Sequence, residues 1–215
     1  DAPSVLDKII YGKERFIAYL KCALLEHVKK DNVVYHGLAG HFFLQGIPNV
    51  IKIRIIANIE DRIKEEMKRE KISKDDARKN LEKDDYERRK WSISLYGRDT
   101  ADPHLYDMIF HVDTLTVDDI VDILERVSKR PCFQTTEQAK KILYDRYLSA
   151  KIEACLVDKF PSVRAHCRDG VTYIDVKCVA TDKKKIIEDI RQLISSYKEL
   201  KDIKVEIEPI CYIPD

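Results

Sequence analysis

The chain has 215 residues, enough for one large domain or two small ones that each bury a core. Charged residues make up 36% of the sequence, yet the formal net charge is only +1, which argues against a broad basic surface for nucleic acid. No apolar run approaches the roughly eighteen residues that a membrane-spanning helix needs. We therefore expect neither a nucleic-acid partner nor a membrane span.

The six cysteines are spread along the chain, and none belongs to a C-x-x-C pair of the kind that binds zinc or carries redox chemistry. Cys155, Cys167 and Cys178 lie among apolar residues, which is typical of small side chains in a core. The sequence therefore predicts no metal site and favours a reduced, cytoplasmic setting.

The first part of the chain alternates predicted helices and strands. Helical periodicity covers residues 13–30, and residues 33–35 have the pattern of a short strand. The β-branched run at 50–57 is typical of a strand that is covered on both faces. Asn58 is expected to cap the next helix, because an asparagine side chain accepts hydrogen bonds from the first free N–H groups of a helix.

A strongly charged helical pair is predicted at residues 60–95. Ser73 begins its second helix with a pattern close to a capping box, and most of the charges are interpreted as a solvated surface with salt bridges between turns. A strand at 106–112 and a helix capped at Thr116 follow. This order of elements indicates an α/β domain with a parallel sheet over residues 1–130.

A second domain is predicted where Pro131 interrupts the pattern, with residues 131–136 as a linker. Asp169-Gly170 carries the signal of a tight β-hairpin. The elements predicted here are a helix at 136–160, strands at 163–167 and 171–179, a helix at 182–197 and a strand at 203–207. We therefore predict a small α+β domain, in the order αββαβ, over residues 137–215.

Candidate binding residues follow the predicted strands, because ligands of an open parallel sheet collect beyond the carboxyl ends of its strands. The first strand leads into HGLAGH at residues 36–41, where the glycines let backbone N–H groups approach a ligand closely. The next strands end at Asn58 and at His111. The predicted substrate contacts are His36, Gly37, Gly40 and His41. The alternative is that these glycines only form a tight turn.

Several arginines on the helical pair are candidates for binding a polyphosphate. Arg62 and Arg69 are seven residues apart, which places them on nearly the same helix face and about 10 Å from each other. Arg88 and Arg89 lie on the second helix. Guanidinium groups suit phosphate because they donate bidentate hydrogen bonds and keep their charge. The alternative is that each arginine pairs with an acid on its own helix.

The run from Val33 to Leu124 resembles the cytidylate-kinase-like proteins of the P-loop kinase fold. The resemblance rests on VVYHGLAGHFFL, on VIKIRIIANIEDRIKEEMKREKISKDDARKNLEKDDYERRKWSISLYG and on DPHLYDMIFHVDTLTVDDIVDIL, in this order. In such kinases, arginines of a helical lid neutralise the phosphoryl group as it is transferred. The resemblance implies catalytic roles for Arg62, Arg69, Arg88 and the lid-orienting Asp85, with less claim for Asp84.

The phosphate-binding loop of that family, G-x-x-x-x-G-K-[ST], does not occur in the 215 residues. Gly12-Lys13-Glu14 is no substitute, because it lacks the first glycine and has Glu14 where the Mg²⁺-binding hydroxyl belongs. The resemblance implies roughly sixty further N-terminal residues with a strand and this loop. A truncated fragment and a natural loss of the loop are both retained as interpretations. ATP and Mg²⁺ are therefore expected only together with that segment, and none is expected to be held by this chain alone.

The position that would bind the acceptor phosphate departs from the family pattern. Cytidylate kinases have an arginine beside the first glycine of the loop, and this chain has Leu38. The resemblance favours ATP-dependent phosphoryl transfer to a nucleoside monophosphate or a similar small acceptor. The alternative is a catalytically inactive pseudokinase that senses nucleotides or binds a protein.

The C-terminal residues 137–215 resemble a BON-type domain in their αββαβ order and in the stretch FPSV…DGVTYIDV that begins at Phe160. Domains of this type are binding or interaction modules. The resemblance implies a regulatory role or assembly through this domain, with a second copy of the chain or another protein as the partner.

Overall fold

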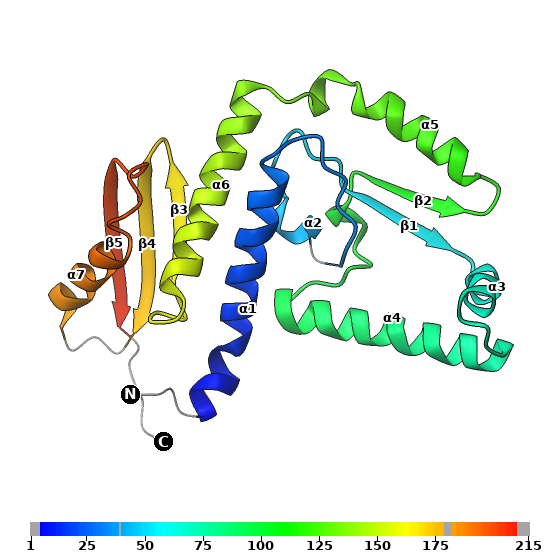
Figure 1. The fold of residues 1–215 in the computed structure, drawn as a ribbon, viewed down its shortest axis with the longest axis horizontal. Coiled ribbons are helices and arrows are strands. Elements are labelled where there is room, and N and C mark those ends of the chain that lie inside the picture. Colours follow the sequence, from blue (N-terminus) through cyan, green and yellow to red (C-terminus); the bar gives the residue numbers. More distant parts are fainter. Residues whose placement is uncertain (1–4, 39, 179–181, 210–215) are drawn as a thin grey trace. The chain divides into compact units, whose positions relative to one another are not determined.

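The structure, a computed structural model, describes residues 5–38, 40–178 and 182–209 (Figure 1). The chain forms two compact units. One unit combines residues 1–34 with residues 137–215, and the other consists of residues 35–136. The chain therefore passes between the units twice, whereas the sequence predicts a single boundary at 131–136.

The unit of residues 35–136 contains a two-stranded parallel sheet whose strands are separated by a helical hairpin (Figure 1). Its elements are α2 (Gly40–Phe43), β1 (Ile53–Ala57), α3 (Ile59–Glu70), α4 (Lys74–Tyr96), a 3₁₀ turn (Pro103–Leu105), β2 (Met108–Val112), α5 (Val117–Ser128) and a second 3₁₀ turn (Pro131–Phe133). The register runs from Ile53 opposite Met108 to Ala57 opposite Val112. Both strands therefore end on the side of α3.

Side chains and turns fix the ends of the hairpin helices. The Ser73 hydroxyl accepts a hydrogen bond of 3.2 Å from the Asp76 N–H and so caps α4, as the sequence predicts. Gly97 ends α4 in a left-handed conformation at φ 67°. Asn58 precedes α3 in an extended conformation, but its side chain makes no cap hydrogen bond. Its Oδ1 atom instead lies 3.1 Å from Nε2 of His111, which joins the ends of the two strands.

The predicted strand at residues 33–35 is not formed, and these residues have no regular structure. A strand needs a neighbour for its N–H and C=O groups, and the sheet of this unit consists of β1 and β2 alone among the described residues. Val34 is 97% exposed, so it has no apolar neighbour to hold it either. The other predicted helices and strands are present with modest shifts at their ends, except that the first helix (Val5–Val28) begins well before the predicted residue 13.

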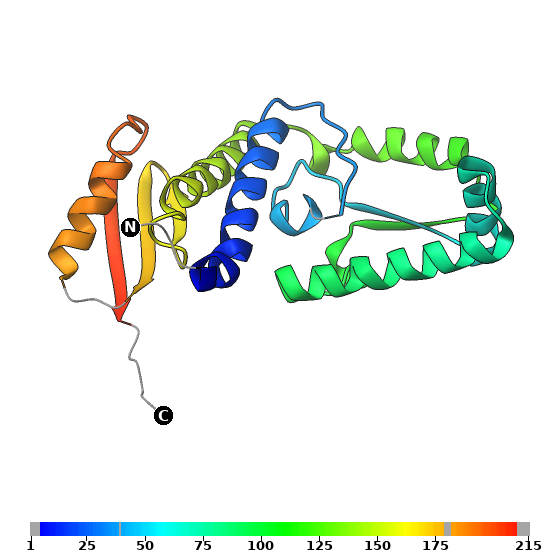
Figure 2. The same cartoon turned by 60° about the horizontal axis from the view of Figure 1, so that its bottom comes forward.

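The second unit consists of a three-stranded sheet and three helices (Figures 1 and 2). Its elements are α1 (Val5–Val28), α6 (Glu137–Leu156), β3 (Arg164–Arg168), β4 (Val171–Cys178), α7 (Lys183–Leu193) and β5 (Asp202–Pro209). The strand order is β3-β4-β5, antiparallel for the first pair and parallel for the second. Helix α1 packs along α6 and contributes Ala18 to the core.

The core of this unit is the apolar layer between helices α6 and α7 and the inner face of the sheet. Its fully buried residues include Ile152 and Leu156 on α6, Ile174 on β4 and Ile190 on α7. The Asp169-Gly170 turn between β3 and β4 has both residues at positive φ, 58° and 85°, as an Asp-Gly hairpin requires. No helix of the described residues is long and apolar enough to cross a membrane.

Candidate functional site

A surface cavity of about 650 Å³ opens between helices α3 and α4 of the hairpin, a volume within the usual range of small-molecule sites. Its lining residues are Arg62, Glu65, Glu66, Lys68, Arg69, Leu81, Asp84 and Arg88. The three arginines that the sequence singles out therefore line one cavity. Four cationic and three acidic side chains share it, so its net charge is only slightly positive.

Arg62 is held by Asp85 of the facing helix. Its Nη1 and Nη2 atoms donate hydrogen bonds of 2.6 and 2.9 Å to the two carboxylate oxygens of Asp85. This bidentate pair raises the pKa of Arg62 and lowers the pKa of Asp85, with hydrogen bonding as the main cause in each case. The pair joins α3 to α4 at the carboxyl end of β1, and Asp85 thereby fixes the direction in which Arg62 points.

Arg69 and Arg88 differ in how far they are already engaged. Arg69 forms ion pairs with Glu66 at 2.6 Å and with Glu70 at 2.9 Å, both on its own helix. Arg88 is exposed and forms no ion pair in the part of the chain that the structure describes. Of the three arginines, Arg88 therefore needs the least rearrangement to bind an anion.

The cavity also contains residues that the sequence analysis leaves unassigned. Glu65 and Glu66 follow Arg62 by three and four residues, so helical periodicity places them on the same face as Arg62 and Arg69. The spacing that pointed to the arginines could have identified these acids as well. Arg89, in contrast, forms an ion pair of 2.7 Å with Asp99 and does not line the cavity.

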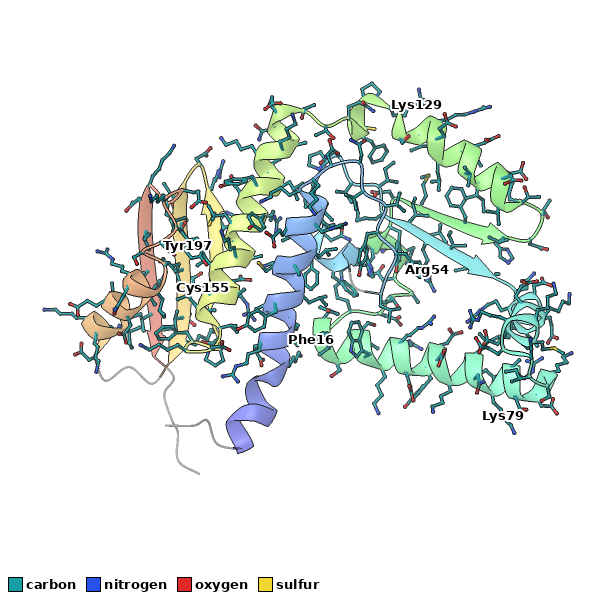
Figure 3. The ribbon with its side chains drawn as sticks, viewed as in Figure 1. Phe16, Arg54, Lys79, Lys129, Cys155 and Tyr197 are labelled. Atoms are coloured by element: carbon teal, nitrogen blue, oxygen red, sulfur yellow. The ribbon has the colours of Figure 1, made fainter. Side chains whose placement is uncertain are left out.

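His41 lies at the other end of the strands. Its ring stacks on Tyr106 at 5.0 Å between centroids, and Tyr106 comes two residues before β2 begins. The arginine cavity lies beyond the strand carboxyl ends, and five-residue strands are about 17 Å long. Figure 3 labels Arg54 near the start of β1 and Lys79 near the start of α4, by the hairpin turn. The predicted histidine and arginine groups are therefore not brought together.

The glycines of the 36–41 segment serve local packing. A Cβ atom at Gly37 or at Gly40 would collide with the ring of Tyr35, so the absence of a side chain lets the backbone wrap around that tyrosine. His36 is exposed, whereas the Nε2 atom of His41 is buried without a hydrogen-bond partner among the described residues. The tight-turn alternative thus has a specific physical basis in this structure.

Burial is the main reason that the pKa of His41 is lowered to about 4, and the charges of Arg98 and Arg54 lower it further. At neutral pH the imidazole is therefore uncharged and is a weak partner for a phosphate. Within the described ranges no three His, Cys, Asp or Glu side chains come together in a way that could hold a metal ion.

Comparison with known proteins adds two matches. The model of the family described as "Cytidylate kinase-like family" matches residues 9–114, just under half of the chain. A cytidylate kinase of Methanosarcina acetivorans is 35% identical over 100 residues, which cover 46% of this chain and 54% of that protein. The chain thus spans about half the length of this curated relative. No solved structure matches the chain.

Proposed function

We propose that this chain forms the lid-bearing part of a nucleotide-binding phosphotransferase similar to the cytidylate kinases. ATP would be the phosphoryl donor, and a nucleoside monophosphate or a similar small molecule the acceptor. The observation that carries the proposal is the convergence of Arg62, Arg69 and Arg88 on one cavity beside the strand carboxyl ends. The similarity over residues 9–114 supports a kinase-like function.

The arginines would act on charge as it shifts between donor and acceptor. Arg88, which has no competing ion pair among the described residues, would contact the transferring phosphoryl group directly. Arg62 would be aimed by its bidentate bond to Asp85, and Arg69 would be released from Glu66 as the anion enters. Preorganised cations of this kind stabilise a phosphoryl-transfer transition state.

A phosphate-binding loop would have to come from a segment outside these 215 residues. The free edge of the sheet supports this proposal, because β1 pairs with β2 alone among the described strands. Ile55 and Ile56 point to opposite faces of β1 and are 62% and 39% exposed, which is unusual for a parallel sheet. A strand added beside β1 would cover part of this surface and would bring its loop to the arginine side. ATP and Mg²⁺ binding would depend on that loop.

The test uses the full-length product of the gene and measures ADP formation from ATP with nucleoside monophosphates as acceptors. Arg88→Ala should lower kcat by about a hundredfold or more without changing the melting temperature. Lys79→Ala is the matched control, because Lys79 lies nine residues earlier on α4, on the opposite face. Equal turnover in Arg88→Ala and Lys79→Ala would remove the lid assignment.

A second candidate is a nucleotide-sensing or protein-binding pseudokinase. It is favoured by Leu38 at the acceptor position and by the acids that already engage Arg62 and Arg69. This function predicts that ATP raises the melting temperature of the full-length protein without any ADP being formed. If neither binding nor turnover occurs, Arg62 and Arg69 serve only their local ion pairs and Arg88 is a solvated surface residue.

We further propose that residues 137–215 form a BON-like interaction module. The support is the αββαβ order of α6, β3, β4, α7 and β5, with an antiparallel and a parallel strand pair. A cytoplasmic location is proposed as well, because ATP and reduced thiols are both found there. Fractionation of cells that contain the tagged protein tests the location.

A further inference from the structure

The sheet of the second unit has one face packed on helices and one face exposed. Alternation along the strands turns the apolar residues inward and leaves charged residues on the other side. This outer sheet face consists of Arg164, His166 and Arg168 on β3, Val171, Tyr173, Asp175 and Lys177 on β4, and Asp202, Lys204, Glu206 and Glu208 on β5. All of them are exposed except Val171, which is half-buried.

Charge is segregated across the outer sheet face. The column on β3 carries two arginines and a histidine and has no acid, whereas the column on β5 carries three acids and one lysine. The strand registers align these columns in rows. Arg164 is in register with Asp175, which is in register with Glu206. In the same way Arg168 and Asp202 flank Val171. One side of the face is therefore basic and the other is acidic.

The charges at the two sides are too far apart to neutralise each other within one copy. Neighbouring strands lie about 4.8 Å apart, so β3 and β5 are separated by roughly 10 Å. The Nη1 atom of Arg164 donates a hydrogen bond of 2.8 Å to the carbonyl oxygen of the neighbouring Val163. Glu206 forms no ion pair within the described ranges, although Lys177 and Glu208 pair at 2.7 Å. Arg164 and Glu206 are thus available to an outside partner.

We propose that the outer sheet face binds a second copy of this chain, related by a two-fold axis parallel to β4. Such an axis exchanges the two sides of the sheet, so the basic column of each copy lies over the acidic column of the other. Arg164 then faces Glu206, and Arg168, which pairs with Asp169 at 3.8 Å within its own copy, faces Asp202. Residues of the central strand meet their own counterparts on the axis, so Tyr173 meets Tyr173, while Asp175 and Lys177 each oppose a like charge and weaken the dimer. A two-fold axis perpendicular to the strands would place β3 over β3 and oppose like charges.

The size of the face sets the expected strength of this dimer. Three strands at about 4.8 Å spacing and up to eight residues in length cover roughly 14 by 26 Å, or about 360 Å² per copy, which is smaller than the roughly 600 Å² per partner of a stable specific interface. Most side chains of the outer sheet face are charged, and Tyr173 is its main aromatic side chain. We therefore expect a weak dimer whose dissociation constant rises with salt, because exposed ion pairs are screened.

The experiment compares the full chain with two variants by sedimentation velocity over a range of concentrations. Variant one is Arg164→Glu/Arg168→Glu, which makes both columns acidic, and variant two is Asp202→Arg/Glu206→Arg, which makes both basic. Each should dimerise at least about tenfold more weakly than the parent chain. An equimolar mixture should form a heterodimer, because each altered column then faces one of opposite charge. Lys185→Glu/Lys184→Glu on α7 is the charge-matched control and should dimerise like the parent.

The equimolar mixture distinguishes the proposed two-fold dimer from association through another surface. A parent chain that stays monomeric up to about 0.5 mM would overturn the proposal. Association that is unchanged in both variants would also overturn it and would point to another surface, such as the free edge of β1. If both variants are monomeric and their mixture is monomeric too, the two-fold arrangement is wrong. Circular dichroism spectra that match the parent establish that the variants are folded.

Discussion

The imidazole of His41 contacts the rings of Phe42 and Tyr106, at 4.1 and 5.0 Å between centroids. Its buried Nε2 atom has no hydrogen-bond partner in the described part of the chain. A side chain in this position contributes as a neutral aromatic ring, and a proton would add a charge close to Arg54 and Arg98. At the scale of single residues, protonation of His41 therefore destabilises the folded state.

The first prediction is a loss of stability in mild acid. The pKa of His41 is about 4 when folded and about 6.5 when unfolded. The unfolded chain therefore binds the proton first as pH falls. The contribution of neutral His41 to the free energy of unfolding should be fully present well above pH 6.5. The free energy of unfolding should then decline by about 2 kcal/mol between pH 6.5 and 4. Urea unfolding followed by fluorescence of the single tryptophan, Trp91, measures this decline in the unit of residues 35–136.

His41→Phe provides the comparison for this prediction. Phenylalanine keeps the ring but cannot bind a proton, so the variant should lose less stability than the parent between pH 6.5 and 4. Carboxylates with lowered pKa, such as Asp85, act on both proteins alike. Identical pH profiles would show that His41 does not titrate in this range.

The second prediction contrasts two glycines. Gly40→Ala places a Cβ atom against the ring of Tyr35, and displacing that ring should cost about 1–3 kcal/mol. Gly12→Ala has open space around its new Cβ in helix α1, and it should stabilise by about 0.5–1 kcal/mol because alanine is the better helix former. Thermal unfolding of both variants measures the two shifts, which should have opposite signs. Tolerance of Gly40→Ala would mean that the Tyr35 ring is loosely held.

At the scale of elements, helix α6 closes one edge of the C-terminal sheet. Strand β3 is an edge strand, and its outward N–H groups at Ala165 and Cys167 donate to Glu153 Oε1 at 3.0 Å and to Ser149 Oγ at 2.8 Å. The two acceptors are four residues apart on the helix, a rise of about 6 Å, which matches two residues of a strand. Polar side chains on a helix thus replace the missing neighbouring strand.

The third prediction concerns Glu153, which is 6% exposed and forms an ion pair of 2.8 Å with Lys21 of α1. Glu153→Ala removes the partner of Lys21 and of the Ala165 N–H together, and should cost about 3 kcal/mol. Glu153→Gln keeps an acceptor for Ala165 and should cost less. The control is Glu137→Ala, because that side chain is 90% exposed in a surface pair. Urea unfolding followed by circular dichroism at 222 nm ranks the three variants, and equal costs for Glu137→Ala and Glu153→Ala would contradict the edge-capping role.

The sequence was sufficient for elements whose signals are local. Ser73, Thr116 and the Asp169-Gly170 turn lie where their capping or hairpin patterns predict. It was not sufficient for residues 33–35, since a strand depends on a neighbour that periodicity does not report. In the same way the arginine spacing predicted a common helix face for Arg62 and Arg69, but the position of His41 depends on Tyr106, which is distant in sequence.

For the whole molecule, the order of the elements along the sequence does not predict which unit contains α1. Most of the helix lies within residues 9–114, which match the family model, yet it belongs to the same compact unit as residues 137–215. The contacts that hold it are Lys21 with Glu153, and Arg15 and Tyr19 with Asp158. A boundary at 131–136 alone would separate α1 from the helix on which it packs.

The last prediction tests that assignment. Leu25 of α1 is fully buried, so Leu25→Ala should cost about 3 kcal/mol by leaving a cavity. Hydrogen exchange on the full chain, read by mass spectrometry, should show faster exchange in α6 and β4, with β1 and β2 unchanged. The reason is that α1 packs on α6, which in turn packs on the C-terminal sheet. Faster exchange confined to β1 and β2 would place α1 with the other unit, and Glu137→Ala, at an exposed site on α6, should leave every segment as in the parent.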